Sequence, residues 1–430
     1  MRRREFLKTS AAVYGSGQRE NPASAQGDSA AHKTLPRQAL LARALQGCDW
    51  LAGPAQVLEK ADPYYGAIRS EYLPASGHWR FYQPDFQEPF WHTGQAVRAL
   101  VLAHELSRNT KYLDAAVRGG QYMIHGQVLD RGDARHYGFL FERTAKGAST
   151  ASQLEGLCAL LDLYRATGDR KWRERFKLGL DWIVKNLYRD GEGRFTNNYL
   201  PAARQFAPPE RSRPLIDDAT LYLAWLEFKE PAYLRMFGEI AGRLLRDEDP
   251  PGNWIRYQPC RTDAFGGQGQ IHPRQAWWWG YPMLAAYDAF QDEKYLKAAA
   301  RTADWYIENS SLDGACYYHN TRNARHLSFD FCVSATGCAG VIYADLWKRT
   351  GQAKYRAAIE KTLGFLLRAQ FGPSAGDPNL RGAFFEGLQP PDGTGRQQYY
   401  IRDISTTFAV RAMLEILRAF PDAQVGYQEF

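Results

Sequence analysis

The sequence predicts an all-α fold of six helical hairpins, about twelve helices in all, and three observations support this. An aromatic residue recurs at spacings of 60, 61, 62 and 60 residues. Apolar residues at three- and four-residue intervals flank each of these aromatic anchors, as in a pair of amphipathic helices. Connections alternate between turns of about three to six residues and loops of roughly 20 to 40 residues. The aromatic anchors are Tyr112, Trp172, Tyr233, Tyr295 and Tyr355.

The helices follow in order from their apolar patterns. A first helix, RQALLARALQGCDWLA, covers residues 37–52, and a last helix, STTFAVRAMLEILRAF, covers residues 405–420. Between them, five pairs of helical segments flank the five anchors. The pairs are 94–109 and 113–126, 154–169 and 173–187, 221–228 and 234–245, 283–290 and 296–309, and 338–351 and 355–370. The short turns therefore share one face of the fold, and the long loops share the other, where binding residues are expected.

The composition is that of a globular protein with ample material for one large core. The chain has 430 residues, a net charge of +7 and 12 Trp, 25 Tyr and 22 Phe. Its Lys and Arg are dispersed, so no nucleic-acid partner is expected, and no apolar stretch approaches the roughly 20 residues of a membrane span. The six cysteines lack metal-ligand spacing, so we expect buried free thiols and neither metal nor other cofactor. The oligomeric state stays open.

The N-terminal segment is similar to an export signal. The stretch RRREFLK at 2–8 resembles the twin-arginine motif, and ASA at 23–25 offers a cleavage site of small residues. We therefore expect a periplasmic or secreted protein, with a cytoplasmic location as the alternative because the apolar part of the segment is short. Residues 1–33 form this signal-like segment, and residues 34–430 are expected to form a single domain.

The 60-residue period over about residues 36–420, together with the segment GQAVRALVLAHELSRNTKYLDAA, resembles the six-hairpin (α/α)6 toroids. The segment is most similar to the second hairpin of sugar epimerases and unsaturated uronyl hydrolases. The resemblance implies an inner ring of helices, each following a long loop, with N-terminal ends at the mouth of a central cavity. It also implies a carbohydrate-active enzyme whose partner is an oligosaccharide or polysaccharide substrate.

Aromatic side chains gather at the predicted mouth. Trp277 lies 18 residues before its anchor, as Gly94 does, which places the run Trp277–Trp279 at the start of the fourth inner helix. Flat rings there fit the C–H faces of sugar rings. Consecutive helical residues point about 100° apart, so at least one of the three is expected to pack between helices. The aromatic residues expected to bind sugar are Trp91, Trp277, Trp278 and Tyr400.

Two adjacent aspartates, Asp217 and Asp218, follow Pro214 at the predicted start of the third inner helix. In unsaturated uronyl hydrolases an aspartate in a similar Asp-Asp context donates the proton, so the resemblance implies that one of the two is the catalytic acid. A carboxyl group in an aromatic cavity has a raised pKa, which suits this role, whereas a helix cap is the structural alternative. Asp330 and Asp403 could supply the second carboxylate that glycoside hydrolysis needs.

Other polar residues complete the candidate site. His92 in the stretch FWHTGQ is a candidate general base or hydroxyl ligand, with a structural role as the alternative. Arg274 and Arg402 suit a substrate carboxylate through bidentate pairing. The remaining candidates for substrate binding are Glu155, His272 and Asp403.

The function expected from this set is a glycoside hydrolase that uses carboxylate acid/base catalysis on an oligosaccharide, uronate-containing ones included. A uronyl or sugar epimerase is one alternative, because His92, His272 and the tract ACYYHNTRN at 315–323 offer acid and base groups. A polysaccharide lyase and a non-catalytic carbohydrate-binding toroid are the others. Carboxylates that converge at the mouth would favour an enzyme over a binding module.

Overall fold

The architecture comes from a computed structural model, which describes residues 31–81, 88–140, 148–200, 205–206, 212–257, 270–271, 273–317, 320–321, 331–387, 401–420 and 425–429. These residues form thirteen α-helices. Two of them, α9 and α10, follow one another directly across Tyr281. They are separate helices because Pro282 has no N–H with which to continue the helical hydrogen bonding. The helices are α2 (Arg37–Ala52), α3 (Glu88–Ser107), α4 (Thr110–His125), α5 (Thr150–Thr167), α6 (Arg170–Leu187), α7 (Thr220–Phe228), α8 (Pro231–Asp247), α9 (Arg274–Gly280), α10 (Pro282–Phe290), α11 (Glu293–Glu308), α12 (Val333–Thr350), α13 (Ala353–Ala369) and α14 (Asp403–Ala419).

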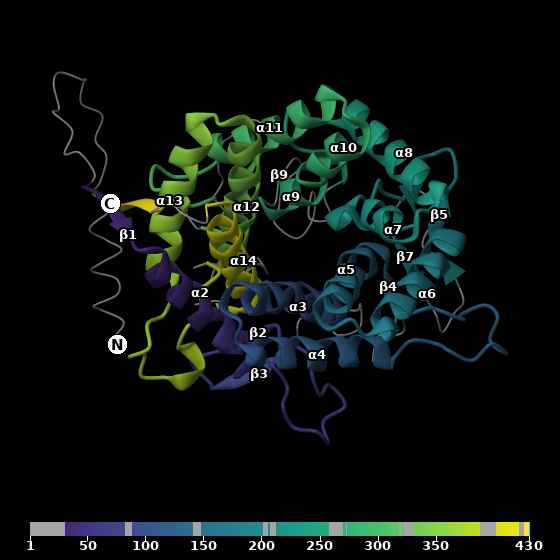
Figure 1. Ribbon diagram of the computed structural model, residues 1–430, viewed down its shortest axis with the longest axis horizontal. Helices are drawn as coiled ribbons and strands as arrows, with labels where there is room; N and C mark the ends of the chain where they lie inside the picture. Colours follow the sequence, from purple (N-terminus) through teal and green to yellow (C-terminus); the bar gives the residue numbers. More distant parts are fainter. Residues whose placement is uncertain are drawn as a thin grey trace.

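The helices form two concentric rings, as Figure 1 shows. The inner ring consists of α3, α5, α7, the pair α9 and α10, α12 and α14, and α14 closes the ring against α3. The outer ring consists of α2, α4, α6, α8, α11 and α13. Five hairpins are consecutive in the sequence, whereas the sixth joins the two ends of the chain, with α2 packed against α14. The predicted all-α (α/α)6 toroid is therefore confirmed.

The five consecutive hairpins each turn within two residues, which is tighter than the sequence predicted. The first residue of every turn has a left-handed backbone, and its N–H donates to the carbonyl four residues earlier, which ends the helix. These residues are Arg108, Gly168, Lys229, Gln291 and Gly351. Only two of the five are glycine, so the other three adopt a conformation that costs an L-residue roughly 1–2 kcal/mol.

The aromatic anchors are the third residues of the outer helices α4, α6, α8, α11 and α13, and all five are buried. Trp172 is 0% exposed. The Tyr112 hydroxyl donates to Asp49 Oδ1 at 2.8 Å and so ties α4 to the neighbouring outer helix α2. Asn109, Asp169 and Asp292 cap the helices ahead of three anchors by accepting a backbone N–H two residues on. The short polar turn and the anchor together define where an outer helix begins.

In the described chain, short strands occur only outside the helical rings, in the connections between helices and at the two ends. The two ends of the chain meet where β1 (Ala31–Leu35) pairs antiparallel with β12 (Val425–Glu429). A three-stranded sheet joins β11 (Ile401–Arg402), β2 (Glu71–Leu73) and β3 (His78–Arg80), with Arg402 opposite Glu71. The other strands are β4 (Ala148–Ser149), β5 (Tyr188–Arg189), β6 (Arg194–Phe195), β7 (Asn198–Leu200), β8 (Gln205–Phe206), β9 (Gln270–Ile271) and β10 (Asn320–Thr321). Three 3₁₀ turns complete the elements: η3 (Asp217–Ala219), η4 (Ile255–Tyr257) and η5 (Pro378–Leu380).

The cysteines behave as the sequence predicted wherever the structure describes them. Cys48, Cys158, Cys316, Cys332 and Cys338 are buried free thiols, while Cys260 lies outside the described residues. None of the helices in the described part of the chain is long and apolar enough to cross a membrane.

Candidate active site

Ten of the thirteen predicted site residues belong to the described part of the structure. They lie at the N-terminal ends of the inner helices or just before them. These are Trp91, His92, Glu155, Asp217, Asp218, Arg274, Trp277, Trp278, Arg402 and Asp403. The other three, His272, Asp330 and Tyr400, lie outside the described residues, so their roles stay predictions.

Helices α3 and α5 approach each other closely, which brings Trp91 of α3 next to Glu155 of α5. A Cβ atom on Gly94 would lie 2.7 Å from the Cα of Gly156, so only glycine fits where these helices cross. Near this crossing, Trp91 Nε1 donates to Glu155 Oε2 at 2.5 Å. Gln95 Nε2 lies 3.3 Å from the same oxygen and donates to Asp218 Oδ2 at 2.9 Å. Gln95 therefore links the carboxylates of Glu155 and Asp218.

The two adjacent aspartates do not lie on the third inner helix, which corrects the placement predicted from Pro214. Helix α7 begins only at Thr220, and the aspartates occupy the preceding 3₁₀ turn η3. The backbone is left-handed at Asp218 (φ 49°) and again at Ala219 (φ 57°), which breaks the helix before it can extend toward Pro214. Two consecutive non-glycine residues of this kind store strain, a feature that clusters at functional sites.

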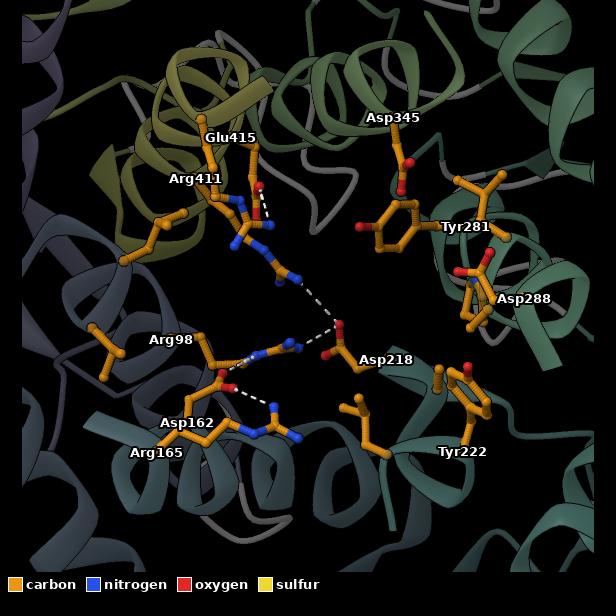
Figure 2. A pocket seen from close by; sticks show the side chains of 18 of the residues that line it. Arg98, Asp162, Arg165, Asp218, Tyr222, Tyr281, Asp288, Asp345, Arg411 and Glu415 are labelled. Carbon is orange, nitrogen blue, oxygen red and sulfur yellow. Dashed lines mark hydrogen bonds and ion pairs between the residues drawn. The ribbon is translucent and has the colours of Figure 1, made fainter. Parts of the chain in front are cut away.

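Asp218 is held as an ion by two arginines (Figure 2). Its Oδ1 lies 2.6 Å from Nη1 of Arg98 and 3.4 Å from Nη2 of Arg411. Burial alone would raise the pKa of Asp218, but the charges of Arg98 and Arg411 and the hydrogen bond from Gln95 lower it below its ordinary value. A carboxylate with this many partners is suited to a fixed negative charge and poorly suited to proton donation.

Glu155 and Asp217 have the opposite electrostatics. Both are almost fully buried, at 2% and 1% exposure. Burial raises the pKa of Asp217 to about 7, against the lowering effect of Arg213. Burial also raises the pKa of Glu155 well above its ordinary value, and the charges of Asp217 and Asp218 raise it further. The pair therefore retains a proton near neutral pH, because two neighbouring buried carboxyl groups do not ionise together.

His92 and Asp403 form a second buried pair across the junction of α3 and α14. Both side chains are 0% exposed, and His92 Nδ1 lies 2.7 Å from each carboxylate oxygen of Asp403. Burial raises the pKa of Asp403, while His92 lowers it. This contact fixes the orientation of the imidazole ring, as carboxylates commonly do for functional histidines.

The two predicted anion-binding arginines already lie beside buried carboxylates. Arg274 Nη1 donates to Ser334 Oγ at 3.0 Å and lies 3.6 Å from Glu386 Oε1. Its guanidinium carbon lies 5.9 Å from the centroid of the Trp91 ring. Arg402 Nε lies 3.5 Å from Glu71 Oε1. Arg274 therefore belongs to the same cluster as Trp91, whereas Arg402 is part of the β2–β11 pairing.

The three consecutive tryptophans point in different directions, as their helical spacing predicted. Trp277 stacks on Tyr281 with ring centroids 3.9 Å apart and lies under the guanidinium of Arg411 at 5.4 Å. Trp279 is 0% exposed and packs edge-on against Trp254, so it is the structural member of the run. Trp278 is half-buried and meets Trp279 edge-on. Sugar binding by Trp277 and Trp278 stays a prediction.

Four residues that contact the predicted site residues were not predicted from the sequence: Gln95, Arg98, Arg411 and Glu386. A signal was present for the two arginines, because both stand in the tetrapeptide AVRA, at 96–99 and 409–412, inside apolar helical runs. A charged residue in such a run requires a buried counter-charge. Glu386 gave no comparable signal, because it lies in a connection whose path the sequence does not define.

Comparisons with known proteins support the fold and leave the reaction open. No family model matches the chain, and no curated protein is significantly similar to it. Solved structures do match. An unsaturated glucuronyl hydrolase specific for heparin superimposes with a TM-score of 0.65 at 15% identity, covering 90% of this chain and 98% of its own. A D-mannose isomerase gives 0.66 at 13% identity, covering 89% and 98%.

A third structure is similar over the same span. The cellobiose 2-epimerase of Bacillus thermoamylovorans gives a TM-score of 0.65 at 11% identity and covers 89% of this chain and 99% of its own. The three proteins carry out different reactions on sugars within one architecture. At these identities the likeness establishes the (α/α)6-toroid fold of this chain and nothing finer.

Proposed function

We propose that this protein is a carbohydrate-active enzyme that hydrolyses a glycosidic bond in an oligosaccharide. The observation that carries the proposal is that the carboxyl groups of Glu155 and Asp217 lie together, 2% and 1% exposed, where burial raises the pKa of both. Glycoside hydrolysis needs one protonated and one ionised carboxyl group beside the scissile bond. A coupled pair that loses its protons in two steps has one of each between those steps.

The surrounding residues support these roles. The protonated member of the pair donates its proton to the glycosidic oxygen as the C–O bond breaks, and the resulting carboxylate accepts a proton from the attacking water. Asp218 positions the pair through Gln95, which donates to Asp218 and approaches Glu155. Trp91 holds Glu155 through its indole N–H and offers a ring face for the sugar. The sugar-processing neighbours of the fold support a carbohydrate substrate, and the twin-arginine-like segment supports export.

An epimerase is the second candidate, favoured by one specific observation. His92 is buried at an inner-helix N-terminus and oriented by Asp403, as a histidine that moves a proton at a sugar carbon should be. Two of the matching structures are a sugar epimerase and a sugar isomerase. In this alternative, His92 rather than the Glu155–Asp217 pair exchanges a proton with the substrate.

Product analysis in isotopic water distinguishes the two candidates. The protein is incubated with a panel of neutral and uronate-containing oligosaccharides in H₂¹⁸O and, separately, in D₂O. Hydrolysis yields new reducing ends, with ¹⁸O in the released sugar when the anomeric carbon is attacked. An intact oligosaccharide with deuterium on a sugar carbon would instead establish epimerisation and refute the proposal. An unsaturated uronate product would establish a lyase and refute it as well.

A further inference from the structure

A cavity lies at the end of the inner helical ring opposite the candidate active site. Its volume is about 300 Å³, and Asp345, Arg349, Glu415 and Arg418 are among the residues that line it. Asp345 is twelve residues beyond Val333, the first residue of α12, or about 18 Å along that helix. The cavity therefore opens where the inner helices end, on the face of the short turns. We call it the far pocket.

The far pocket shares one acidic residue with the candidate active site. Asp218 lines the pocket and, on its other side, accepts the hydrogen bond from Gln95. Figure 2 shows Asp218 between two walls. One wall carries Arg98, Arg411 and Asp162, and the other carries the rings of Tyr222 and Tyr281. Because Asp218 is bound to both arginines, these ion pairs separate the far pocket from the candidate active site.

The lining is densely charged and yet close to neutral. Five arginines and six carboxylates face the far pocket, and the arginines are already paired. Arg98 Nε donates to Asp162 at 2.9 Å, and Arg165 lies 3.7 Å from the same carboxylate. Arg349 bonds both Asp288 and Asp345, and Arg418 bonds Glu415. An added anion would meet these carboxylates and an added cation would meet the guanidinium groups, so neither is favoured.

Hydroxyl groups suit this lining better than ions do. A hydroxyl both donates and accepts, so it can bond a carboxylate and a guanidinium at once. Each guanidinium has five N–H donors, and the contacts of Arg98 with Asp162 and Asp218 engage its Nε and Nη1 atoms. Tyr222 and Tyr281 supply ring surface for C–H groups, and Leu223 and Leu284 add apolar contact. Small-molecule pockets combine an apolar wall with a few placed polar groups in this way, from about 300 Å³ upward.

We propose that the far pocket is a second ligand site, separate from the candidate active site, that binds a single uncharged sugar ring. The sugar hydroxyls bond the arginine–carboxylate pairs, and one face of the ring lies against Tyr222 and Tyr281. Uronates and amino sugars bind more weakly, because the lining offers no unbalanced charge. The binding proposed here does not depend on which reaction occurs at the candidate active site.

The test measures binding of monosaccharides to the full chain by isothermal titration. The probes are D-glucose, D-mannose, D-galactose and D-xylose, with D-glucuronate and D-glucosamine as charged comparators. All proteins carry Trp91→Ala, which weakens binding at the other end. Ala285→Phe fills the far pocket, which Ala285 lines. Ala289→Phe is the matched control, because Ala289 lies one turn later on α10, is similarly half-buried and is absent from the lining.

We expect at least one neutral sugar to bind, with affinity lowered at least tenfold by Ala285→Phe and unchanged by Ala289→Phe. Tyr222→Ala opens the pocket instead of filling it and should weaken the same binding. This variant replaces Ala285→Phe in the test if Ala285→Phe does not fold. Equal affinity in Ala285→Phe and Ala289→Phe, tighter binding of D-glucuronate, or no binding of any neutral probe would overturn the proposal. Asp217→Asn in a protein that keeps Trp91 should leave this binding intact while lowering kcat at least about 100-fold, so failure of the far pocket and failure of the proposed function remain distinguishable.

Discussion

Nη1 of Arg98 lies 2.6 Å from Oδ1 of Asp218, and the preceding residue, Asp217, has no comparable ion pair among the described residues. Two aspartates that are adjacent in the sequence therefore have opposite electrostatics. The pKa of Asp218 is lowered and that of Asp217 is raised to about 7. The left-handed backbone at Asp218 and Ala219 accompanies this arrangement. One turn thus supplies both a permanent anion and a group that can hold a proton.

Asp217→Asn should stabilise the protein at neutral pH and leave its stability almost unchanged in acid. The wild-type carboxyl is protonated in the folded state up to about pH 7, but in the unfolded state only to about 3.8. Its contribution to stability is therefore fully present below pH 3.8 and is lost as the pH rises toward 7. The advantage of the variant should grow by about 1.4 kcal/mol per pH unit across that window and then level off. Urea unfolding at a series of pH values measures it.

Asp218→Asn should have the opposite effect on stability from Asp217→Asn. The lowered pKa of Asp218 means that its stabilising contribution is present above pH 3.8 and is lost as the pH falls through its folded-state pKa. At pH 7 the variant removes the anion that Arg98 and Arg411 share and leaves Arg98 with Asp162 alone, which should destabilise the fold by about 3–5 kcal/mol. Equal effects of the two substitutions at pH 7 would contradict the assignment of opposite charge states.

Trp91→Phe should move the alkaline limit of activity to higher pH. The indole N–H of Trp91 donates to Glu155 and stabilises its ionised form, so its removal raises the pKa of Glu155 further. If the Glu155–Asp217 pair supplies the proton, the pH at which kcat/KM falls should rise. A pH–rate profile of the variant and the wild type checks this. A lower activity with an unshifted profile would mean that Trp91 acts on the substrate alone.

Trp172→Ala should destabilise the fold without changing the site. Trp172 is 0% exposed, so its removal leaves a large cavity between the rings and should cost about 3–5 kcal/mol. Substrate affinity of the folded protein should stay the same, because the residue begins an outer helix away from the long connections. Lys171→Ala removes an exposed cation over the Trp172 ring together with an exposed ion pair to Asp169, and is the control. Normal stability with lost binding would reverse the assignment.

Arg108→Gly should stabilise the protein by about 0.5–1 kcal/mol, because an exposed arginine holds φ at 58° in the turn between α3 and α4. Gly168 holds the equivalent position after α5 at φ 71°, and a Cβ atom there would meet nothing within 4 Å. Gly168→Ala should therefore destabilise through backbone strain alone. Thermal unfolding of the two variants gives shifts of opposite sign if the left-handed turns cap the helices as the structure indicates.

The fold was predictable because its repeat is visible in single residues. Each anchor, such as Tyr112 or Tyr355, occupies the third position of an outer helix, so the 60-residue period marks helix starts directly. The pairing of the first and last helices has no anchor of its own and followed only from the count of six hairpins, since α2 and α14 meet where the ring closes. The left-handed turn at Asp218 and Ala219 was also hidden, because neither residue is a glycine that would signal it.

The sequence predicted which helices carry the site residues, but not which residues contact one another. Alignment on the anchors placed Trp91, Glu155 and Trp277 at inner-helix starts, where the structure has them. The sequence could not indicate that Arg411 would pair with Asp218, because 193 residues separate them and only ring closure brings them together. From the sequence alone, Asp217 and Asp218 were therefore equivalent candidates. In the structure they differ, because Arg98 and Arg411 form ion pairs with Asp218.

The most direct test of the central claim compares turnover of Glu155→Gln, Asp217→Asn and His92→Ala on an oligosaccharide that the wild-type protein cleaves. Both carboxyl variants should stay folded, as circular dichroism would verify. The account predicts that each of them lowers kcat by at least about 100-fold, because each removes one carboxyl group of the buried pair. If both carboxyl variants turn over within about threefold of the wild type while His92→Ala is inactive, the pair is structural and the claim is wrong.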